Sequence, residues 1–260
     1  MMIYLISFFL LFFVFYLFFK SFFKSKKDNH LDLTSKQIDI LEKNVLFYSN
    51  LSQEEKNRFS KRVADFLSRI NIIEISCIAS ETDVILLGAS AIIPVFGFNE
   101  WNYLNLKEVY LFPNAFNYNL EYSKSIKEKT ILGMVGNGKL KDRMVISQKA
   151  LRHGFQNKTD KNNTAIHEFV HLIDMADGNI DGFPESIIKN PFVLPWFDLM
   201  HKKIDKINEN KSDINSYGAT SKIEFFAVAS EYFFERPKLL KRKHPILYKN
   251  LSQFFNQDLV

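Results

Sequence analysis

The chain has 260 residues, 47% of them hydrophobic and 24% charged, so it can bury a full-sized core and wholesale disorder is not expected. Its formal net charge is +5, but the segment 20–28 supplies +3 of this, and no stripe of basic residues interleaved with aromatic residues follows. We therefore do not expect nucleic acid as a partner, and the single cysteine, Cys77, excludes an intramolecular disulfide.

Residues 1–19 form an apolar segment without a charged side chain. As a helix at 1.5 Å per residue they would span roughly 28 Å, which is enough to cross a bilayer. A cleaved signal peptide has basic residues before its apolar run and a small-residue cleavage site after it, and both are missing. We predict one uncleaved transmembrane helix, then a juxtamembrane linker at 20–33. Because the basic residues follow the helix, the positive-inside rule predicts a single-pass protein of the bacterial inner membrane with its C-terminal domain in the cytoplasm.

Two helices are predicted at the start of this C-terminal domain, residues 34–260. Thr34 or Ser35 could cap a helix that continues to about Phe47. Ser52 and Glu55 have the spacing of a capping box, which predicts a second helix. The apolar residues of the second helix recur at helical spacing, and we interpret them as core positions: Phe59, Val63, Phe66, Leu67 and Ile70.

Residues 84–98 are nearly uncharged and rich in small residues, which predicts a buried helix ended by Pro94 or Gly97. With about 15 residues this stretch is too short for a second membrane span. Three runs that suit strands follow, at residues 109–112, 131–135 and 144–147.

The pattern is helical from Asn163 onward, apart from a loop that contains Gly178 and Gly182. Further helices are predicted near 187–209, 221–235 and 245–256. The predicted fold class is therefore α+β, a mostly helical domain with a small sheet.

The segment 164–175 contains the pattern H-E-x-x-H, formed by His167, Glu168 and His171. On a helix, positions i and i+4 share a face, so the two imidazoles can bind one tetrahedral metal ion. Glu168 would face the open coordination position and take a proton from a water that the metal has made more acidic. The pattern predicts Zn2+ as the cofactor and a peptide or protein as the substrate.

A catalytic zinc of this class needs a third protein ligand. Asp177 stands six residues after His171, where the metzincin pattern has a histidine, and remains a candidate. Glu224 is the stronger one, because a carboxylate from a second helix packed on the first would complete a His, His, Glu set. Glu231 lies nearly on the same face, and either metal or a hydrogen bond must satisfy it, since a buried unpaired carboxylate is costly.

The roles of the other candidate residues are less defined. Asp174, one turn beyond His171, either orients a ligand histidine or pairs locally. The remaining histidines have no partner at ligand spacing, and we interpret them as surface or packing residues: His30, His153, His201 and His244.

Three strings of the sequence resemble a known family of zinc peptidases: AIHEFVHLIDMADGNIDGFPE at 165–185, SYGATSKIEFFAVASEYFFERPKLL at 216–240 and HPILYKNLSQFFNQD at 244–258. The family is that of Mlc titration factor A, the glucose-regulated metallopeptidases, and weaker similarity covers most of the chain after about residue 40.

This resemblance implies a zincin-like, more narrowly gluzincin-like, metallopeptidase fold. It implies His167, His171 and Glu224 as zinc ligands, Glu168 as base and Tyr217 as an active-site hydroxyl. It also implies activity on short peptides, with aminopeptidase character in some members.

Two features depart from this family. The transmembrane anchor is absent from its soluble members, which argues against carrying over their cytosolic regulatory protein as a partner, although some regulatory protein remains a candidate. Lys222 stands where the family has a proline, two residues before the ligand glutamate. We expect a membrane-anchored zinc peptidase. The alternative is a protein-binding regulator with a structural or vestigial zinc site, which would have no need of Glu168.

Overall fold

The structure is a computed structural model and describes residues 32–260, except 118, 122–130, 137, 158–159 and 186–192. The chain divides into two units, Met1–Leu31 and Asp32–Val260, and the second of these is compact. The predicted transmembrane helix at 1–19 lies outside the described residues, as does most of the predicted linker, so both stay predictions. In the part of the chain that is described, no helix combines the length and the apolar character needed to cross a bilayer.

The second unit begins with three helices, α2 (Ser35–Asn44), α3 (Leu46–Ser49) and α4 (Gln53–Arg69). Thr34 caps α2 and Ser52 caps α4, each through a complete capping box, which confirms both predicted starts. The first predicted helix is interrupted at Val45, whose backbone is extended, so it forms two helices instead of one.

The predicted core face of α4 is confirmed: Phe59, Val63 and Phe66 are buried, and Leu67 and Ile70 pack against the core from partly buried positions.

The predicted apolar helix is α5 (Glu81–Val95), and nearly all of its residues are buried. It starts before residue 84 because Ser80 caps it through a capping box with Asp83. Pro94 lies inside the last turn and does not end the helix there. The chain leaves the helix before Gly97, where a Cβ would lie only 2.2 Å from the carbonyl oxygen of Phe255.

A four-stranded sheet has the order β1-β2-β4-β3. Its strands β1 (Asn71–Glu74), β2 (Glu108–Phe112) and β4 (Arg143–Ser147) are parallel, and β3 (Gly133–Val135) pairs antiparallel with β4. The three predicted strands are confirmed. Strand β1 was not predicted, because it follows α4 with a single intervening residue, Ile70, that suited the helical pattern.

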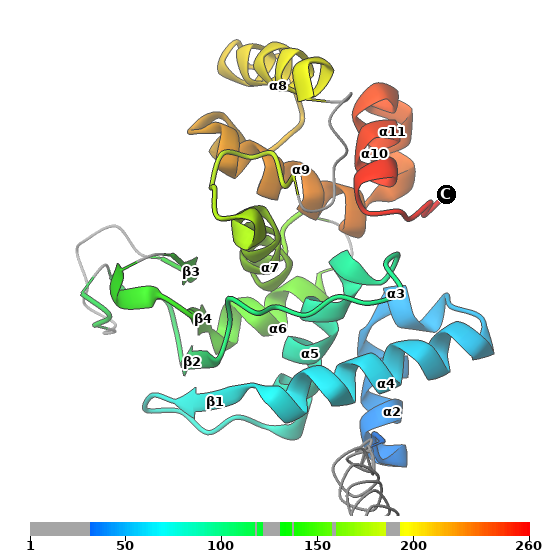
Figure 1. Ribbon diagram of the computed structural model, residues 1–260, viewed down its shortest axis with the longest axis vertical. Helices are drawn as coiled ribbons and strands as arrows, with labels where there is room; N and C mark the ends of the chain where they lie inside the picture. Colours follow the sequence, from blue (N-terminus) through cyan, green and yellow to red (C-terminus); the bar gives the residue numbers. More distant parts are fainter. Residues whose placement is uncertain (1–31, 118, 122–130, 137, 158–159, 186–192) are drawn as a thin grey trace, which may run out of the picture. The chain divides into compact units, whose positions relative to one another are not determined.

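Most of the described residues after strand β4 are helical (Figure 1). The helices are α6 (Gln148–Gln156), α7 (Thr164–Asp174), α8 (Val193–Asn208), α9 (Lys222–Glu235), α10 (Pro237–Lys243) and α11 (Pro245–Phe254). Helices α6 and α10 were not predicted as separate elements. The fold is therefore α+β, mostly helical with a small mixed sheet.

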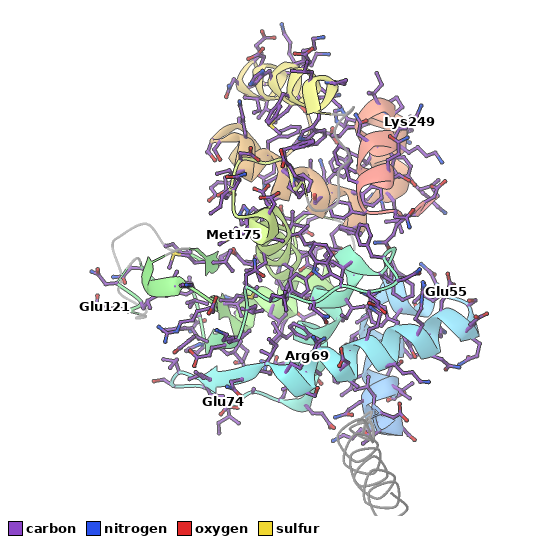
Figure 2. All side chains as sticks on the ribbon, in the orientation of Figure 1. Glu55, Arg69, Glu74, Glu121, Met175 and Lys249 are labelled. Carbon is purple, nitrogen blue, oxygen red and sulfur yellow. The ribbon has the colours of Figure 1, made fainter. Side chains whose placement is uncertain are left out.

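Helix α7 occupies the centre of this arrangement, where it contacts α5, α6, α9 and strand β3 (Figure 1). Its residues from Ala165 to Asp174 are all buried. Phe169 is fully buried and packs its ring against those of Phe66 and Tyr103, at centroid distances of 5.6 and 5.2 Å. Side chains fill the space between α7 and its neighbours (Figure 2). A helix packed on several sides holds its polar side chains in fixed positions.

Candidate metal centre

Two histidines one turn apart on α7 form the first part of the site. Asn163 caps the helix, and its Oδ1 accepts a hydrogen bond from the backbone N of Ile166 at 3.2 Å. His167 and His171 lie on the same face, with ring centroids 4.5 Å apart and nearly perpendicular planes. Both side chains are largely buried. The spacing therefore brings the two imidazoles together, as predicted.

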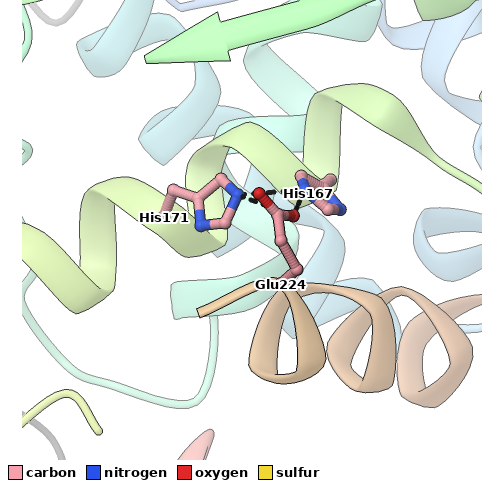
Figure 3. A group of neighbouring side chains, drawn as sticks. All are labelled: His167, His171 and Glu224. Atoms are coloured by element: carbon pink, nitrogen blue, oxygen red, sulfur yellow. Dashed lines mark hydrogen bonds and ion pairs between the residues drawn. The ribbon is translucent and has the colours of Figure 1, made fainter. Parts of the chain in front are cut away.

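Helix α9 supplies the third side chain of the group. Ser221 caps this helix, and its Oγ accepts a hydrogen bond from the backbone N of Glu224 in the first turn. Glu224 Oε2 lies 2.9 Å from His167 Nε2 and 3.5 Å from His171 Nε2, and the two Nε2 atoms are 2.9 Å apart (Figure 3).

These three side chains fit a zinc ion. Each offers one ligand atom, and the three atoms lie within 4.8 Å of one another. Two ligands of a tetrahedral ion at 2.0–2.1 Å are about 3.3 Å apart, a value that the observed separations bracket. Two imidazoles and a carboxylate are also the donor set that zinc takes in catalytic sites.

A carboxylate behind His167 fixes the orientation of its ring. Glu231 Oε1 accepts a hydrogen bond from Nδ1 of His167 at 2.7 Å, which leaves Nε2 to face Glu224. Glu231 Oε2 accepts a second bond from the backbone N of Asn163 at 2.6 Å. Of the two ways in which Glu231 could be satisfied, the structure shows hydrogen bonding, which is the usual support of a metal-binding histidine.

The charges of the site favour a cation. Burial would lower the pKa of His167, but Glu231 and Glu224 outweigh it and raise this pKa well above its ordinary value. Burial would raise the pKa of Glu224, but hydrogen bonds from His167 and His171 hold it well below the ordinary range. The carboxylates of Glu231 and Glu224 therefore stabilise positive charge at His167, beside the position where the three ligand atoms meet.

Glu168 lies beside this group and is 5% exposed. Burial raises the pKa of its carboxyl, and the two histidines oppose that effect. Strand β3 packs directly against it: a Cβ at Gly133 would lie 2.7 Å from Glu168 Oε1 and 2.8 Å from Cγ2 of Thr164. Gly133 therefore leaves the space that Glu168 occupies. The sequence analysis did not identify this residue, because its short strand carries no motif.

Tyr217 lies on the short 3-10 helix η4 (Ser216–Ala219), which contacts α9. Its ring centroid is 6.0 Å from that of His167, and 45% of its surface is exposed. The structure thus places a solvent-accessible phenol next to one of the histidines.

A polar network anchors the segment before η4. Asp213 accepts hydrogen bonds from Lys161 at 3.0 Å, Tyr232 at 2.8 Å and His244 at 2.8 Å. Burial would raise the pKa of Asp213, but these bonds and one from Lys243 hold it well below the ordinary range. His244 is therefore a buried member of this network, away from the metal-binding group. The sequence analysis did not identify Asp213.

The two acidic residues after His171 accept hydrogen bonds from the backbone of the loop that follows α7. Asp177 accepts hydrogen bonds from the backbone N of Asn179 and of Glu185, and lies outside the His, His, Glu group. Asp174 Oδ2 accepts a bond from the backbone N of Gly182, whereas its buried Oδ1 has no partner among the described residues. Of the two interpretations of Asp174, the structure shows local pairing.

Comparison with known sequences adds a family context. The sequence matches the family described as glucose-regulated metallo-peptidase M90 over residues 20–256. Mlc titration factor A of Serratia proteamaculans is 36% identical over 104 residues, which are 37% of this chain and 39% of that protein.

Two further relatives show the range of the matches. Mlc titration factor A of Salmonella arizonae has the same identity over 104 residues and 41% of its length. An uncharacterized protein of Synechocystis sp., slr2042, is 24% identical over 225 residues, which are 83% of this chain and 82% of that protein. The chain thus matches about two fifths of the length of the two Mlc titration factor A proteins.

Proposed function

The chain belongs to the family of glucose-regulated metallo-peptidases M90, and on this premise we propose that it is a zinc-dependent peptidase of the gluzincin-like type. We assign the metal to His167, His171 and Glu224. The observation that carries the proposal is the convergence of these side chains from α7 and α9, with Glu168 one residue after the first histidine.

Each residue has a defined task in this proposal. When bound, zinc supplies Lewis acidity that makes a water molecule more acidic and polarises the carbonyl group of the substrate. Glu168 accepts a proton from the water while the oxygen of that water attacks the carbonyl carbon. The same carboxyl then gives the proton to the amine as the C–N bond breaks. Glu231 keeps His167 in the tautomer that leaves Nε2 available to the metal.

Tyr217 stabilises the charge that develops on the substrate. A tyrosine stays protonated at neutral pH, since its unperturbed pKa is about 10, and can donate a hydrogen bond to the carbonyl oxygen. That oxygen becomes negative only on the way to the tetrahedral intermediate, so the bond lowers the barrier more than it strengthens substrate binding. Its position beside His167 and its exposure support this task.

A second candidate function is that of a protein-binding regulator with a structural zinc site. It is favoured by the name of the relatives, Mlc titration factor A, which refers to a protein, Mlc. The buried Glu168 next to the ligand group favours the peptidase, because a structural site needs no base.

We further propose that residues 1–19 anchor the enzyme in the bacterial inner membrane with the catalytic domain in the cytoplasm. The support is the uncharged apolar run followed by lysines. Reporter fusions to the C-terminus would show a cytoplasmic signal, and the mature protein would retain its first 19 residues. A periplasmic signal, or loss of these residues, would refute the anchor without affecting the catalytic assignment.

The test of the peptidase is cleavage of a peptide library by the full-length chain, purified in mild detergent, with and without a zinc chelator. We expect about one zinc per chain and cleavage that the chelator abolishes. The fragment ends would also show whether amino-terminal residues are removed singly. Stoichiometric zinc without cleavage of any peptide would favour the regulator.

A further inference from the structure

Gly182 lies between elements that carry the proposed metal ligands. Its backbone N donates a hydrogen bond at 3.0 Å to Oδ2 of Asp174, the last residue of α7 and one turn beyond His171. Its carbonyl oxygen accepts a bond at 2.9 Å from Nε1 of Trp196 on α8, and the indole is almost fully buried. Gly182 is therefore fixed to both α7 and α8.

Gly182 also abuts the first turn of α9. A Cβ at this position would lie 2.5 Å from the carbonyl oxygen of Lys222 and 2.8 Å from its carbonyl carbon. Lys222 is the first residue of α9, and Glu224 follows two residues later. Because the atoms met are helix backbone, they cannot rotate aside as a flexible side chain could. The contact therefore limits where α9 can lie.

The ring of Phe197 on α8 contacts both the first turn of α9 and the loop that contains Gly182. Lys222 Nζ lies 4.8 Å from the centroid of the Phe197 ring, in a cation–π contact. The ring of Phe183, the residue after Gly182, packs 5.8 Å from that of Phe197. The ammonium group of Lys222 therefore holds the first turn of α9 against α8.

We propose that Gly182, held by Asp174, is a positioning residue that sets the place of Glu224 relative to His171 and thereby the affinity of the site for zinc. The inference rests on the proposed role of Glu224 as a ligand. The path from one ligand to the other consists of a helical turn, one hydrogen bond, one backbone contact and two residues of helix.

The size of the expected displacement follows from the contact distance. An ordinary Cβ contact is at least 3.4 Å, so a Cβ that starts 2.5 Å from Lys222 would push the backbone away by about 1 Å. Metal sites tolerate deviations of about 0.2 Å in ligand distance. A displacement of this size, passed from Lys222 to Glu224 along the helix, would therefore weaken the bond from Glu224 to the metal.

The loop contains a matched control for this effect. Gly178 also has a positive φ, +95° against +78° for Gly182, but a Cβ at Gly178 would meet no atom within 4 Å. Alanine at either position adds the same kind of backbone strain. Only alanine at 182 would also push against α9.

The test compares Gly182→Ala and Gly178→Ala in the full-length chain, with zinc affinity measured by competition with a chromophoric chelator and the metal-free fold checked by circular dichroism. We expect Gly182→Ala to bind zinc about 10- to 100-fold more weakly than the parent, as changes in supporting residues typically do. Gly178→Ala should bind within about threefold of the parent, since its Cβ reaches nothing. Equal affinities of the two variants would overturn the inference.

A second pair of variants decides the matter if Gly182→Ala fails to fold. Asp174→Ala removes the acceptor of the Gly182 N–H, whereas Asp174→Asn keeps one acceptor oxygen for it, loses the charge and gains an NH2 group. We expect weak zinc binding by Asp174→Ala and near-parental binding by Asp174→Asn, and equal affinities of this pair would overturn the inference. If the parent binds no zinc, or if binding survives His167→Ala, the proposed function itself fails.

Discussion

His167 Nδ1 lies 2.7 Å from Glu231 Oε1, on the opposite side of the ring from the Nε2 that faces Glu224. The other oxygen of Glu231 binds the backbone N of Asn163, the cap of α7. One carboxylate on α9 therefore both orients a proposed metal ligand and holds the start of the helix that carries it.

Glu231→Gln should weaken zinc binding by about 10- to 100-fold. A glutamine can still accept the bond from His167, but its NH2 group then faces the N–H of Asn163, so one hydrogen bond is lost. The control is Glu235→Gln, one turn further along α9, because Glu235 binds the Asn163 side chain and not His167. Chelator competition measures both, and similar losses in the two variants would contradict the assigned role.

Glu224→Gln should release zinc far more readily than Glu231→Gln or Asp177→Asn, because Glu224 alone of the three is proposed to bind the metal directly. Both carboxylate oxygens of Asp177 already accept bonds from its own loop. Elemental analysis after mild chelation measures the retained zinc. Strong zinc loss from Asp177→Asn with Glu224→Gln unaffected would place the site in a metzincin-like arrangement instead.

Glu168→Gln should retain zinc and lose turnover by at least about 100-fold, since removal of a general base has effects of this order. His167→Ala is the matched comparison, because it should lose zinc and activity together. Zinc content and peptide cleavage are measured on the same preparations. Parental turnover by Glu168→Gln would show that another group takes the proton.

Tyr217→Phe should reduce kcat by about 10- to 1000-fold, with little change in KM or zinc content, if the phenol donates to the developing oxyanion. Steady-state kinetics and zinc analysis on one preparation separate the interpretations. An unchanged kcat would eliminate the catalytic role. Lost zinc would assign Tyr217 to the support of His167, whose ring lies 6.0 Å away.

Asp174 should make the metal-free protein less stable as the pH rises from about 4 to above 6. Burial raises its pKa from 3.8 to about 6, so the unfolded chain loses this proton at a lower pH than the folded one. The cost is absent below pH 4 and complete above pH 6, at roughly 3 kcal/mol. Asp174→Asn should therefore unfold at higher denaturant concentration than the parent at pH 7.5, with no such gain at pH 4. An equal gain at both pH values would exclude ionisation as the cause.

Features that depend on neighbours in sequence could be predicted from the sequence. The helix cap at Thr34, the capping box at Ser52 and the pairing of His167 with His171 each need only residues three or four positions apart. Strand β1 escaped prediction for the opposite reason: its four residues are extended because they pair with β2, which lies more than 30 residues further along the chain.

Support of the site could not be predicted in the same way. Glu231 reaches residues 64 and 68 positions away, and Asp213 joins Lys161 to His244 across more than 80 positions. A single sequence shows that such carboxylates need partners but does not say which ones. The helical pattern placed both Glu224 and Glu231 on the inward face of a second helix, but it could not tell a metal ligand from a carboxylate that hydrogen-bonds His167.

The close approach of Gly133 to Glu168 extends the functional part of the chain to a residue with no reactive group. Gly133 lies on strand β3, and any larger residue there would place a Cβ 2.7 Å from Oε1 of the proposed base. Its neighbour Leu132 is 49% exposed and meets no such limit. In a saturation screen scored by peptide cleavage, position 133 should therefore tolerate fewer amino acids than position 132.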